Sequence, residues 1–468
     1  MSRGQGARGA RGVVPALLTV PLALTLVLTG CTSDAEPEPE PTPSPTATEP
    51  TVPDEETVLS FGAFGAEEEL GAYRAVAETF DALDPEVEVR VRTAPDAEAL
   101  AQQLRSGSLP DVFMVSRQEL AWLLEEQLTL PVDTLLDERG VDFGDDYSRD
   151  GLEAFSAADR LQCMPYGLSP TVMFYNTDLV DFGRMDARGL PVPGGEEPLT
   201  WSYEAFTAAA GFASRPRGNT RGIHVEPTLD GIAPFVYTGG GELYDDPVAP
   251  TATAFSDGAT RDALEATLPV LRDPLVTLDQ KMLQRRTPLE WFERGKLAMM
   301  PGTRDLVPRL RMVQGLDFDV IAMPSLEGRA TVGDVTGLCL SRETEDVSAA
   351  ADLLVHLLST PSVQRVVGAG YLVPANQEVA LSDDFWQPGR MPRHAQVFTA
   401  SVRDMVLPPL VDELPALEAA VRPGIGRLLN EPVLDDLEAI TEQIDEAARA
   451  VLAPEDAADG TESPSPAE

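Results

Sequence analysis

The fold is decided by residues 57–83, TVLSFGAFGAEEELGAYRAVAETFDAL. The first five residues are predicted to form a short apolar strand, and the next four are predicted to form a turn that contains two glycines. Residues 66–83 then favour a helix, because apolar side chains recur at spacings of three and four. This stripe consists of Leu70, Tyr73, Val76, Phe80 and Leu83. The alternation of Val87, Val89 and Val91 predicts a second strand, so the chain begins as a β-α-β unit.

The alternation of helix and strand continues beyond this unit. Leu100 and Leu104 mark a second helix, and residues 111–115 form an apolar run that is typical of a buried parallel strand. Ser116 and Glu119 have the spacing of a capping box, which predicts the start of another helix. Such units predict an α/β open sheet, whose ligand site lies outside the carboxyl ends of the strands.

The two ends of the chain differ from this body. Residues 1–30 have the order of a secretory signal and end in Leu28-Thr29-Gly30, directly before Cys31. This tetrapeptide resembles the bacterial lipobox, which predicts cleavage before Cys31 and a lipid on its sulfur; the alternative is an ordinary signal with an incidental cysteine. Residues 31–56 are mostly acidic residues, Pro, Ser, Thr and Ala, which predicts a disordered tether because little apolar surface can be buried. The tail, residues 453–468, has the same composition and is also predicted to be disordered.

The bulk composition excludes several classes of function. A chain of 468 residues is long enough for two domains. Its net charge of −42, from 77 Asp and Glu against 35 Lys and Arg, argues against binding of nucleic acid or a polybasic membrane patch. Three cysteines and three histidines are scattered, and no nucleophile, phosphate-loop or zinc-protease motif occurs. The pairs Asp145-Asp146 and Asp383-Asp384 are interpreted as solvated residues rather than glycosidase acids. The sequence therefore predicts that the protein is not an enzyme and that it binds neither a cofactor nor a metal.

Further motifs follow one another along the rest of the chain. They are residues 72–80 (AYRAVAETF), 109–112 (LPDV), 164–167 (MPYG), 174–179 (FYNTDL), 200–206 (TWSYEAF), 239–241 (GGG), 292–300 (FERGKLAMM) and 372–375 (LVPA). Each motif is weak alone. Their order over residues 57–452, together with two C-terminal helices and the lipobox, resembles family 1 of the bacterial extracellular solute-binding proteins, the group that includes maltose-binding protein.

The resemblance implies an α/β, periplasmic-binding-protein-like fold of two lobes, joined by hinge strands, with a ligand cleft between them. By analogy, lobe 1 takes residues 57–163 and 338–398, lobe 2 takes residues 164–337, and helices within 399–452 pack on lobe 2. The implied function is that of an extracellular solute-binding lipoprotein of an ABC importer. Its partners would be the permease subunits, the cell membrane through the lipid anchor, and a sugar or oligosaccharide that a monomer captures on the extracytoplasmic face.

Candidate ligand contacts follow from the strand ends and from the resemblance. A sugar site needs polar and charged side chains, since each buried polar group must find a partner. Phe64, Glu67, Ser116 and Arg117 follow the first and third strands, and the family match adds Ser169, Asp230, Arg304 and Asp334. The same match implies that Cys163 and Cys339 lie on strands that cross between the lobes, where they form either a disulfide or two buried thiols.

The tripeptide Gly302-Thr303-Arg304 departs from the Gly-Pro-Trp of many carbohydrate binders in the family. A guanidinium therefore replaces a stacking aromatic ring, and a guanidinium also suits a carboxylate or phosphate. The sequence is thus also compatible with other ligands, namely a polyamine, an organic phosphate or a sugar acid. A sensor or adhesin that works without a transporter also remains open. Trp386 is expected either to cover the cleft or to act as a surface anchor.

Overall fold

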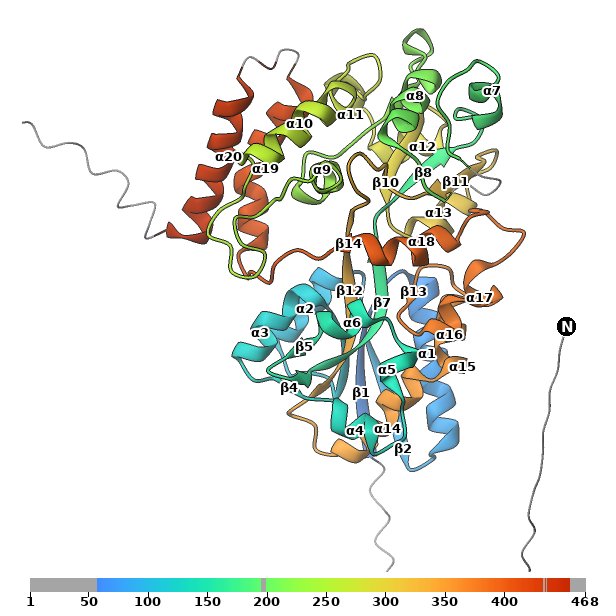
Figure 1. Ribbon diagram of the computed structural model, residues 1–468. Helices are drawn as coiled ribbons and strands as arrows, with labels where there is room; N and C mark the ends of the chain where they lie inside the picture. The colour runs from blue at the N-terminus through green and yellow to red at the C-terminus, as the bar shows by residue number, and fades with distance from the viewer. Residues whose placement is uncertain (1–56, 195–198, 432–433, 435, 455–468) are drawn as a thin grey trace, which may run out of the picture. The chain divides into compact units, whose positions relative to one another are not determined.

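The computed structural model describes residues 57–194, 199–431, 434 and 436–454 (Figure 1). The predicted signal peptide, Cys31, the tether and most of the acidic tail lie outside the described residues. The described residues belong to one compact unit, which contains two principal β-sheets. Within them, no helix combines the length and the apolar character needed to cross a membrane.

The first sheet contains the N-terminal β-α-β units. Its strands follow the order β13-β7-β12-β3-β1-β2, and β4 and β14 also pair with β12. They are β1 (Thr57–Phe64), β2 (Val87–Ala94), β3 (Val112–Ser116), β4 (Thr129–Leu130), β7 (Cys163–Pro170), β12 (Thr331–Ser341), β13 (Val373–Pro374) and β14 (Met405–Val406). The prediction of parallel pairing is confirmed for β1 with β2 and β3. Strand β12, however, runs antiparallel to β3 and β7, so the sheet is mixed.

Two local predictions in this sheet are wrong. Strand β1 continues to Phe64, because its pairing with β2 extends through the residues predicted as a turn. Ser116 does not form a capping box: its hydroxyl accepts from the Gln118 amide, and Glu119 instead forms an ion pair with Arg105 at 2.8 Å. A short 3-10 turn, η1 (Arg117–Glu119), precedes the next helix and changes the spacing that a capping box requires.

The second sheet has the order β11-β8-β10-β9. Its strands are β8 (Val172–Asn176), β9 (Arg221–Ile223), β10 (Leu297–Gly302) and β11 (Phe318–Ile321). Strand β8 runs antiparallel to β10 and β11, and β9 runs parallel to β10. A separate hairpin is formed by β5 (Ser156–Ala157) and β6 (Arg160–Leu161).

Helices cover both sheets (Figure 1). Those that precede the second sheet are α1 (Glu67–Leu83), α2 (Ala97–Ser106), α3 (Leu120–Glu125), α4 (Asp133–Asp137), α5 (Phe143–Asp146) and α6 (Arg149–Ala154). Those between β8 and β12 are α7 (Phe182–Asp186), α8 (Tyr203–Ala213), η2 (Pro216–Gly218), α9 (Leu229–Tyr237), α10 (Gly258–Leu271), α11 (Gln280–Leu283), α12 (Pro288–Glu293) and α13 (Leu306–Arg311). The last group is α14 (Val347–Leu358), α15 (Thr360–Val367), α16 (Gln377–Ala380), α17 (Asp383–Trp386), α18 (Gln396–Ser401), η3 (Val402–Asp404), α19 (Leu414–Asn430) and α20 (Leu437–Leu452).

The chain crosses between the sheets at two adjacent places. Thr171 alone separates β7 from β8, and β12 brings the chain back from β11. The two crossings are hydrogen-bonded to each other: the Thr171 amide donates to the Val332 carbonyl at 2.8 Å, and the Thr331 hydroxyl donates to the Thr171 carbonyl at 2.5 Å. This pair of crossings forms a hinge between the two sheets.

Two hydrophobic cores support this arrangement. The second core covers one face of the second sheet with α8, α9 and α10, and it includes the buried faces of α19 and α20. On β8, Met173 and Tyr175 belong to this second core, whereas Phe174 between them belongs to the first. Successive side chains of a strand point to opposite faces, so one strand contributes to both cores.

The first core is continuous across the two sheets. It contains the helices packed on the first sheet and also the face of the second sheet that carries Phe174 and Phe318. The ring of Phe174 lies 6.1 Å from the rings of both Phe318 and Phe398. Phe398 is on α18, so the segment from α16 to α18 packs against both sheets on this side of the hinge.

Candidate functional site

Three predicted contact residues, Ser116, Ser169 and Asp334, lie at the ends of neighbouring strands on the side of the first sheet that meets the hinge. We call these strand ends the polar edge. Asp334 of β12 is paired with Ser169 of β7, and Thr336 of β12 is paired with Ser116 of β3. Because residues two apart on a strand share a face, Asp334 and Thr336 point the same way. The structure therefore brings Ser116, Ser169 and Asp334 together beside the hinge.

Arg117 follows Ser116 and is half-buried. Its Nη1 atom donates to the carbonyl of Pro408 at 2.7 Å, while its Nε–H is buried without a partner. Burial lowers the pKa of Arg117, and the nearby charge of Asp334 raises it. The guanidinium therefore retains a donor for another group at this edge.

Asp334 is a carboxyl group that resists ionisation. Burial raises its pKa to about 6, and the charge of Asp230 acts in the same direction. Hydrogen bonds from Ser116 and the Val335 amide and the charge of Arg117 oppose this rise. Asp230 lies in the first turn of α9, which packs beside β12, so its charge reaches Asp334 of the hinge strand.

A groove of about 480 Å³ extends from this point over the second sheet. Polar side chains in its lining include His224, Glu226, Thr228 and Asp230, and apolar lining is provided by residues such as Met300. The buried His224 has no hydrogen-bond partner at Nε2, which lies 3.8 Å from a carboxylate oxygen of Glu226. Burial raises the pKa of Asp230. The groove can thus offer hydrogen-bond acceptors and one unused imidazole nitrogen to a polar solute.

The two candidates near the start of α1 differ in position. Phe64 is half-buried at the end of β1, whereas Glu67 is exposed and forms an ion pair with Arg74 at 2.6 Å. The Glu67 side chain retains 77% of its exposure, so it faces solvent on α1. Of these two residues, Phe64 lies at the strand end that the fold predicts for a ligand site.

Glu69 is a buried acid that the sequence analysis missed. It is 8% exposed, and its carboxylate lies against Gly65, where a Cβ atom would approach Oε2 within 2.4 Å. Burial and the charge of Asp305 raise the pKa of Glu69 to about 7, and the Tyr73 hydroxyl and the Ala66 amide oppose this rise. The signal was available, because Glu69 precedes Tyr73 of the buried stripe by four residues.

Arg304 lies away from this polar edge. It is 1% exposed, its guanidinium carbon stands 3.9 Å above the ring of Phe385, and Nη2 donates to the Phe385 carbonyl at 2.7 Å. The guanidinium carbon also lies 5.5 Å from the centre of the ring of Phe398, which is on α18. Its neighbour Asp305 is exposed and interacts with Glu69, so adjacent residues point in different directions.

Trp386 lines a different cavity from the groove at Asp230. This cavity has a volume of about 580 Å³ and is formed by Leu168, Pro374, Trp386 and Gln396, among others. Leu168 precedes Ser169 on β7, so the two side chains point to opposite faces of the sheet. Trp386 therefore does not lie where it would cover the groove at Asp230, which was one of its two expected roles.

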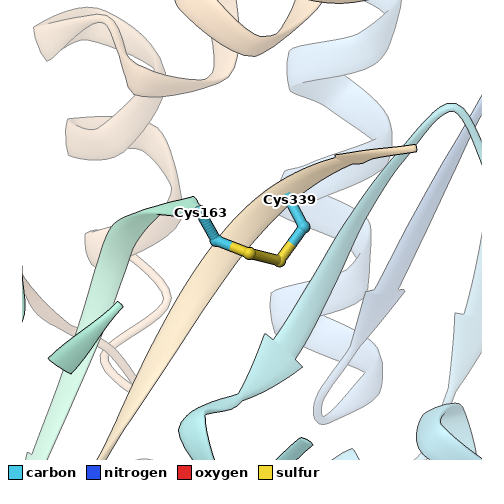
Figure 2. The surroundings of a disulfide bond; sticks show 2 residues. All are labelled: Cys163 and Cys339. Atoms are coloured by element: carbon cyan, nitrogen blue, oxygen red, sulfur yellow. A yellow bond between two sulfur atoms is a disulfide. The ribbon is translucent and has the colours of Figure 1, made fainter. Parts of the chain in front are cut away.

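Cys163 and Cys339 are joined by a disulfide at the base of the hinge strands (Figure 2). Both residues are fully buried. Among the described residues, no group of three or more His, Cys, Asp or Glu is placed to hold a metal ion.

The sequence matches one family model, described as bacterial extracellular solute-binding protein, over residues 75–393. The match includes β3, β7, β12, the helix α9 that carries Asp230, and the loop that carries Arg304. No curated protein matches the chain in sequence.

Solved structures with the same fold are numerous. The ABC substrate-binding protein Lmo0181 from Listeria monocytogenes, in complex with cycloalternan, is 18% identical, with a TM-score of 0.69 over 84% of this chain and 97% of that chain. The sugar-binding protein MalE from Xanthomonas citri is 17% identical, with a TM-score of 0.68 over 87% and 100%. The GacH receptor of Streptomyces glaucescens, solved unliganded and with acarbose, is 19% identical, with a TM-score of 0.66 over 85% and 98%. These similarities establish the two-lobed α/β fold.

Proposed function

The chain belongs to the bacterial extracellular solute-binding proteins, and we propose that it captures a sugar or oligosaccharide between its two lobes and delivers it to an ABC importer. In this proposal the protein is a binding protein and not an enzyme. Closure about the hinge at Thr171 and Val332 would enclose the solute and present the closed form to the permease.

The observation that carries the proposal is that α9, which carries Asp230, packs beside β12, which carries Asp334, so that the charge of Asp230 reaches Asp334. Asp334 is on a hinge strand beside Ser116 and Ser169, and Asp230 begins a helix over the second sheet. Carboxylates accept hydrogen bonds, and sugar hydroxyls donate them, so a saccharide between these groups would satisfy both. The ligands bound in two of the similar solved structures, cycloalternan and acarbose, support a saccharide over other solutes.

The charge of the cleft helps to rank the alternatives. The charge of Asp305 acts on Glu69, and the charge of Asp230 acts on Asp334. A sugar acid or an organic phosphate would add negative charge to this region, which costs electrostatic energy. A polyamine would instead neutralise it. We therefore keep a cationic solute as the second candidate, and a sensor without a transporter as the third.

Lipid anchoring completes the proposal. Cys31 follows the lipobox-like sequence, and two or more acyl chains give stable attachment to a membrane. The acidic, proline-rich residues 31–56 would hold the binding domain away from the membrane surface. The mature protein is then a monomer on the extracytoplasmic face of the cell, close to its permease. The lobe boundaries at residues 163, 337 and 398 belong to the same proposal, and the two crossings between the sheets, at Thr171 and Val332, lie close to the first two boundaries.

The proposal is tested by a thermal-shift screen of the purified protein against neutral oligosaccharides, sugar acids, organic phosphates and polyamines. A solute that binds only the folded state raises the melting temperature. We expect a rise with a neutral saccharide. A rise with a polyamine and with no saccharide would overturn the sugar assignment but not the family.

The saccharide found in this way then tests the site itself. Asp334→Asn should weaken binding tenfold or more by calorimetry, since hydrogen bonds to a charged group contribute about 1.5–3 kcal/mol. Asp186→Asn, at an exposed position on α7, is the matched control and should leave the Kd unchanged. Equal affinities for the two variants would place the saccharide elsewhere.

A further inference from the structure

Four arginines gather on the outer side of the lobe junction, in a chain whose net charge is −42. They are Arg304, which lies just before α13, Arg311, which is the last residue of α13, and Arg390 and Arg393, which precede α18. Burial and the charge of Arg311 lower the pKa of Arg304 to about 9. Burial and the charge of Arg390 likewise lower the pKa of Arg311 to about 10. Like charges are therefore held near one another instead of being separated.

Several donors of these arginines have no acceptor. Arg304 is 1% exposed, and its Nε and Nη1 atoms are buried without a partner. Arg311 donates to the Met391 carbonyl and to Gln387 Oε1, each at 2.5 Å, but its buried Nη2 is also without a partner. A buried donor without an acceptor costs about 1–3 kcal/mol, so an anion beside Arg311 would supply an acceptor that this side chain lacks. The Arg304 donors lie against Phe385 and Phe398 instead and belong to the packing of this region.

A groove of about 980 Å³ opens over Arg311, Arg390 and Arg393. Its walls come from α13 on one side and from Ala369 and residues 388–391 on the other. Arg390 and Arg393 are exposed to solvent and can move toward a ligand. The two walls approach closely at Gly370, where a Cβ atom would lie 3.3 Å from both Arg311 Nη1 and Pro308.

Acidic groups do not neutralise the groove. Asp317 is the one carboxylate among the described residues of its lining, against three arginines. The nearby Asp319 is already engaged, since its Oδ2 lies 2.7 Å from Nδ1 of His394 and its Oδ1 accepts the His394 amide at 3.0 Å. The groove therefore keeps an excess of positive charge.

We propose that this groove is a binding site for a phosphate group, held by Arg311, Arg390 and Arg393 at the outer side of the lobe junction. Guanidinium forks match the several oxygens of a phosphate in geometry and charge, whereas a single carboxylate would use fewer of the donors. The site is separate from the polar edge at Asp334 and does not depend on the identity of the transported solute. It joins α13 to the segment that follows α15, so phosphate should stabilise the packing between them.

Titration calorimetry of the purified protein with inorganic phosphate, in a zwitterionic buffer of low ionic strength, tests the site. We expect saturable binding of one phosphate and a higher melting temperature than in sodium chloride of equal ionic strength. The double variant Arg390→Gln/Arg393→Gln should weaken phosphate binding at least tenfold. Both residues are exposed, so the variant should fold, and without phosphate its melting temperature should be no lower than that of the wild type. Arg217→Gln, an exposed arginine on η2, is the matched control.

Equal stabilisation by chloride and phosphate, or unchanged phosphate affinity in the double variant, would overturn the proposal. A second arm identifies the source of the phosphate group. Arginine-dependent cosedimentation with phosphatidylglycerol vesicles, but not with phosphatidylcholine vesicles, would assign it to lipid headgroups. Binding of inorganic phosphate without cosedimentation would assign it to a soluble phosphate compound.

Discussion

Cys163 of β7 and Cys339 of β12 occupy directly opposed positions in an antiparallel pair, and a disulfide joins them with their Cα atoms 4.3 Å apart. The bond links residues that are separated by 176 positions in the sequence. It lies in the two strands that cross to the second sheet, a few residues before Thr171 and after Val332. The hinge therefore has a covalent link at its base, and both lobes depend on the strands that carry it.

We expect the disulfide to stabilise the folded protein and to resist reduction while the protein is folded. Closing so long a loop restricts the unfolded chain, and such bonds typically contribute about 2–4 kcal/mol. Replacing both cysteines by alanine should lower the free energy of unfolding by this amount in a denaturant titration. Thiol labelling of the denatured, unreduced protein should detect neither residue. Labelling of both would contradict the bond.

The stability of the protein should fall as the pH rises from 4.5 to 7, in part because of Glu69. In the unfolded chain this carboxyl ionises near pH 4.5, whereas in the folded protein burial and Asp305 raise its pKa to about 7. Its stabilising effect is therefore complete below pH 4.5 and is lost as the pH rises through 7. The shift corresponds to a loss of about 3 kcal/mol.

Glu69→Gln removes this titration. The unfolding free energy of the variant minus that of the wild type should increase by about 3 kcal/mol from pH 4 to pH 8, measured by urea denaturation at each pH. Glu78→Gln, at an exposed position of the same helix, is the control and should change equally at both pH values. A Glu69→Gln variant whose difference from the wild type is the same at pH 4 and pH 8 would show that Glu69 titrates normally.

Arg304 should act in packing rather than as the ligand anchor that the sequence predicts. Arg304→Met keeps an unbranched apolar side chain against Phe385 and removes a buried charge with two unpaired donors, so the melting temperature should stay the same or rise. Arg304→Ala leaves a cavity there and should cost about 2 kcal/mol or more. Calorimetry then decides the role: unchanged saccharide affinity in Arg304→Met fits packing, and a tenfold loss would support the anchor.

Cys31 should determine whether the protein stays on the membrane. The thiol is the lipid acceptor in the lipobox interpretation, so Cys31→Ser should move the protein from the membrane fraction to the soluble fraction. Metabolic labelling with a radioactive fatty acid should mark the wild type and not the variant. Retention of Cys31→Ser on the membrane would contradict the anchor and favour an ordinary signal peptide.

Local periodicity was sufficient for the first helices and strands of the chain. The stripe from Leu70 to Phe80 predicted α1, and alternation at Val87 and Val89 predicted β2, because the spacing of apolar residues directly reflects the helical or extended backbone. The order of motifs led to the correct family and the two-lobed fold. The strand ends predicted contacts at Phe64 and Ser116, because parallel strands place their carboxyl ends at one edge, whereas Asp334 was predicted from the family resemblance.

Other features depended on residues far apart in the sequence. The end of β1 was missed because pairing with β2 overrode the turn preference of its glycines. The interaction of Glu69 with Asp305 was missed because neither local pattern contains information about the other residue.

By itself, the sequence determined the helices and strands, the family, and the chemistry available at the strand ends, since these depend on neighbouring residues and their order. Only the tertiary structure decided where the charged side chains point. Arg304 and Asp305 are adjacent in the chain, yet one is buried on Phe385 and the other faces Glu69. The backbone turn before α13 and the packing of α17 and α18 separate them. Burial and pKa depend on that packing, which brings together segments that no local spacing relates.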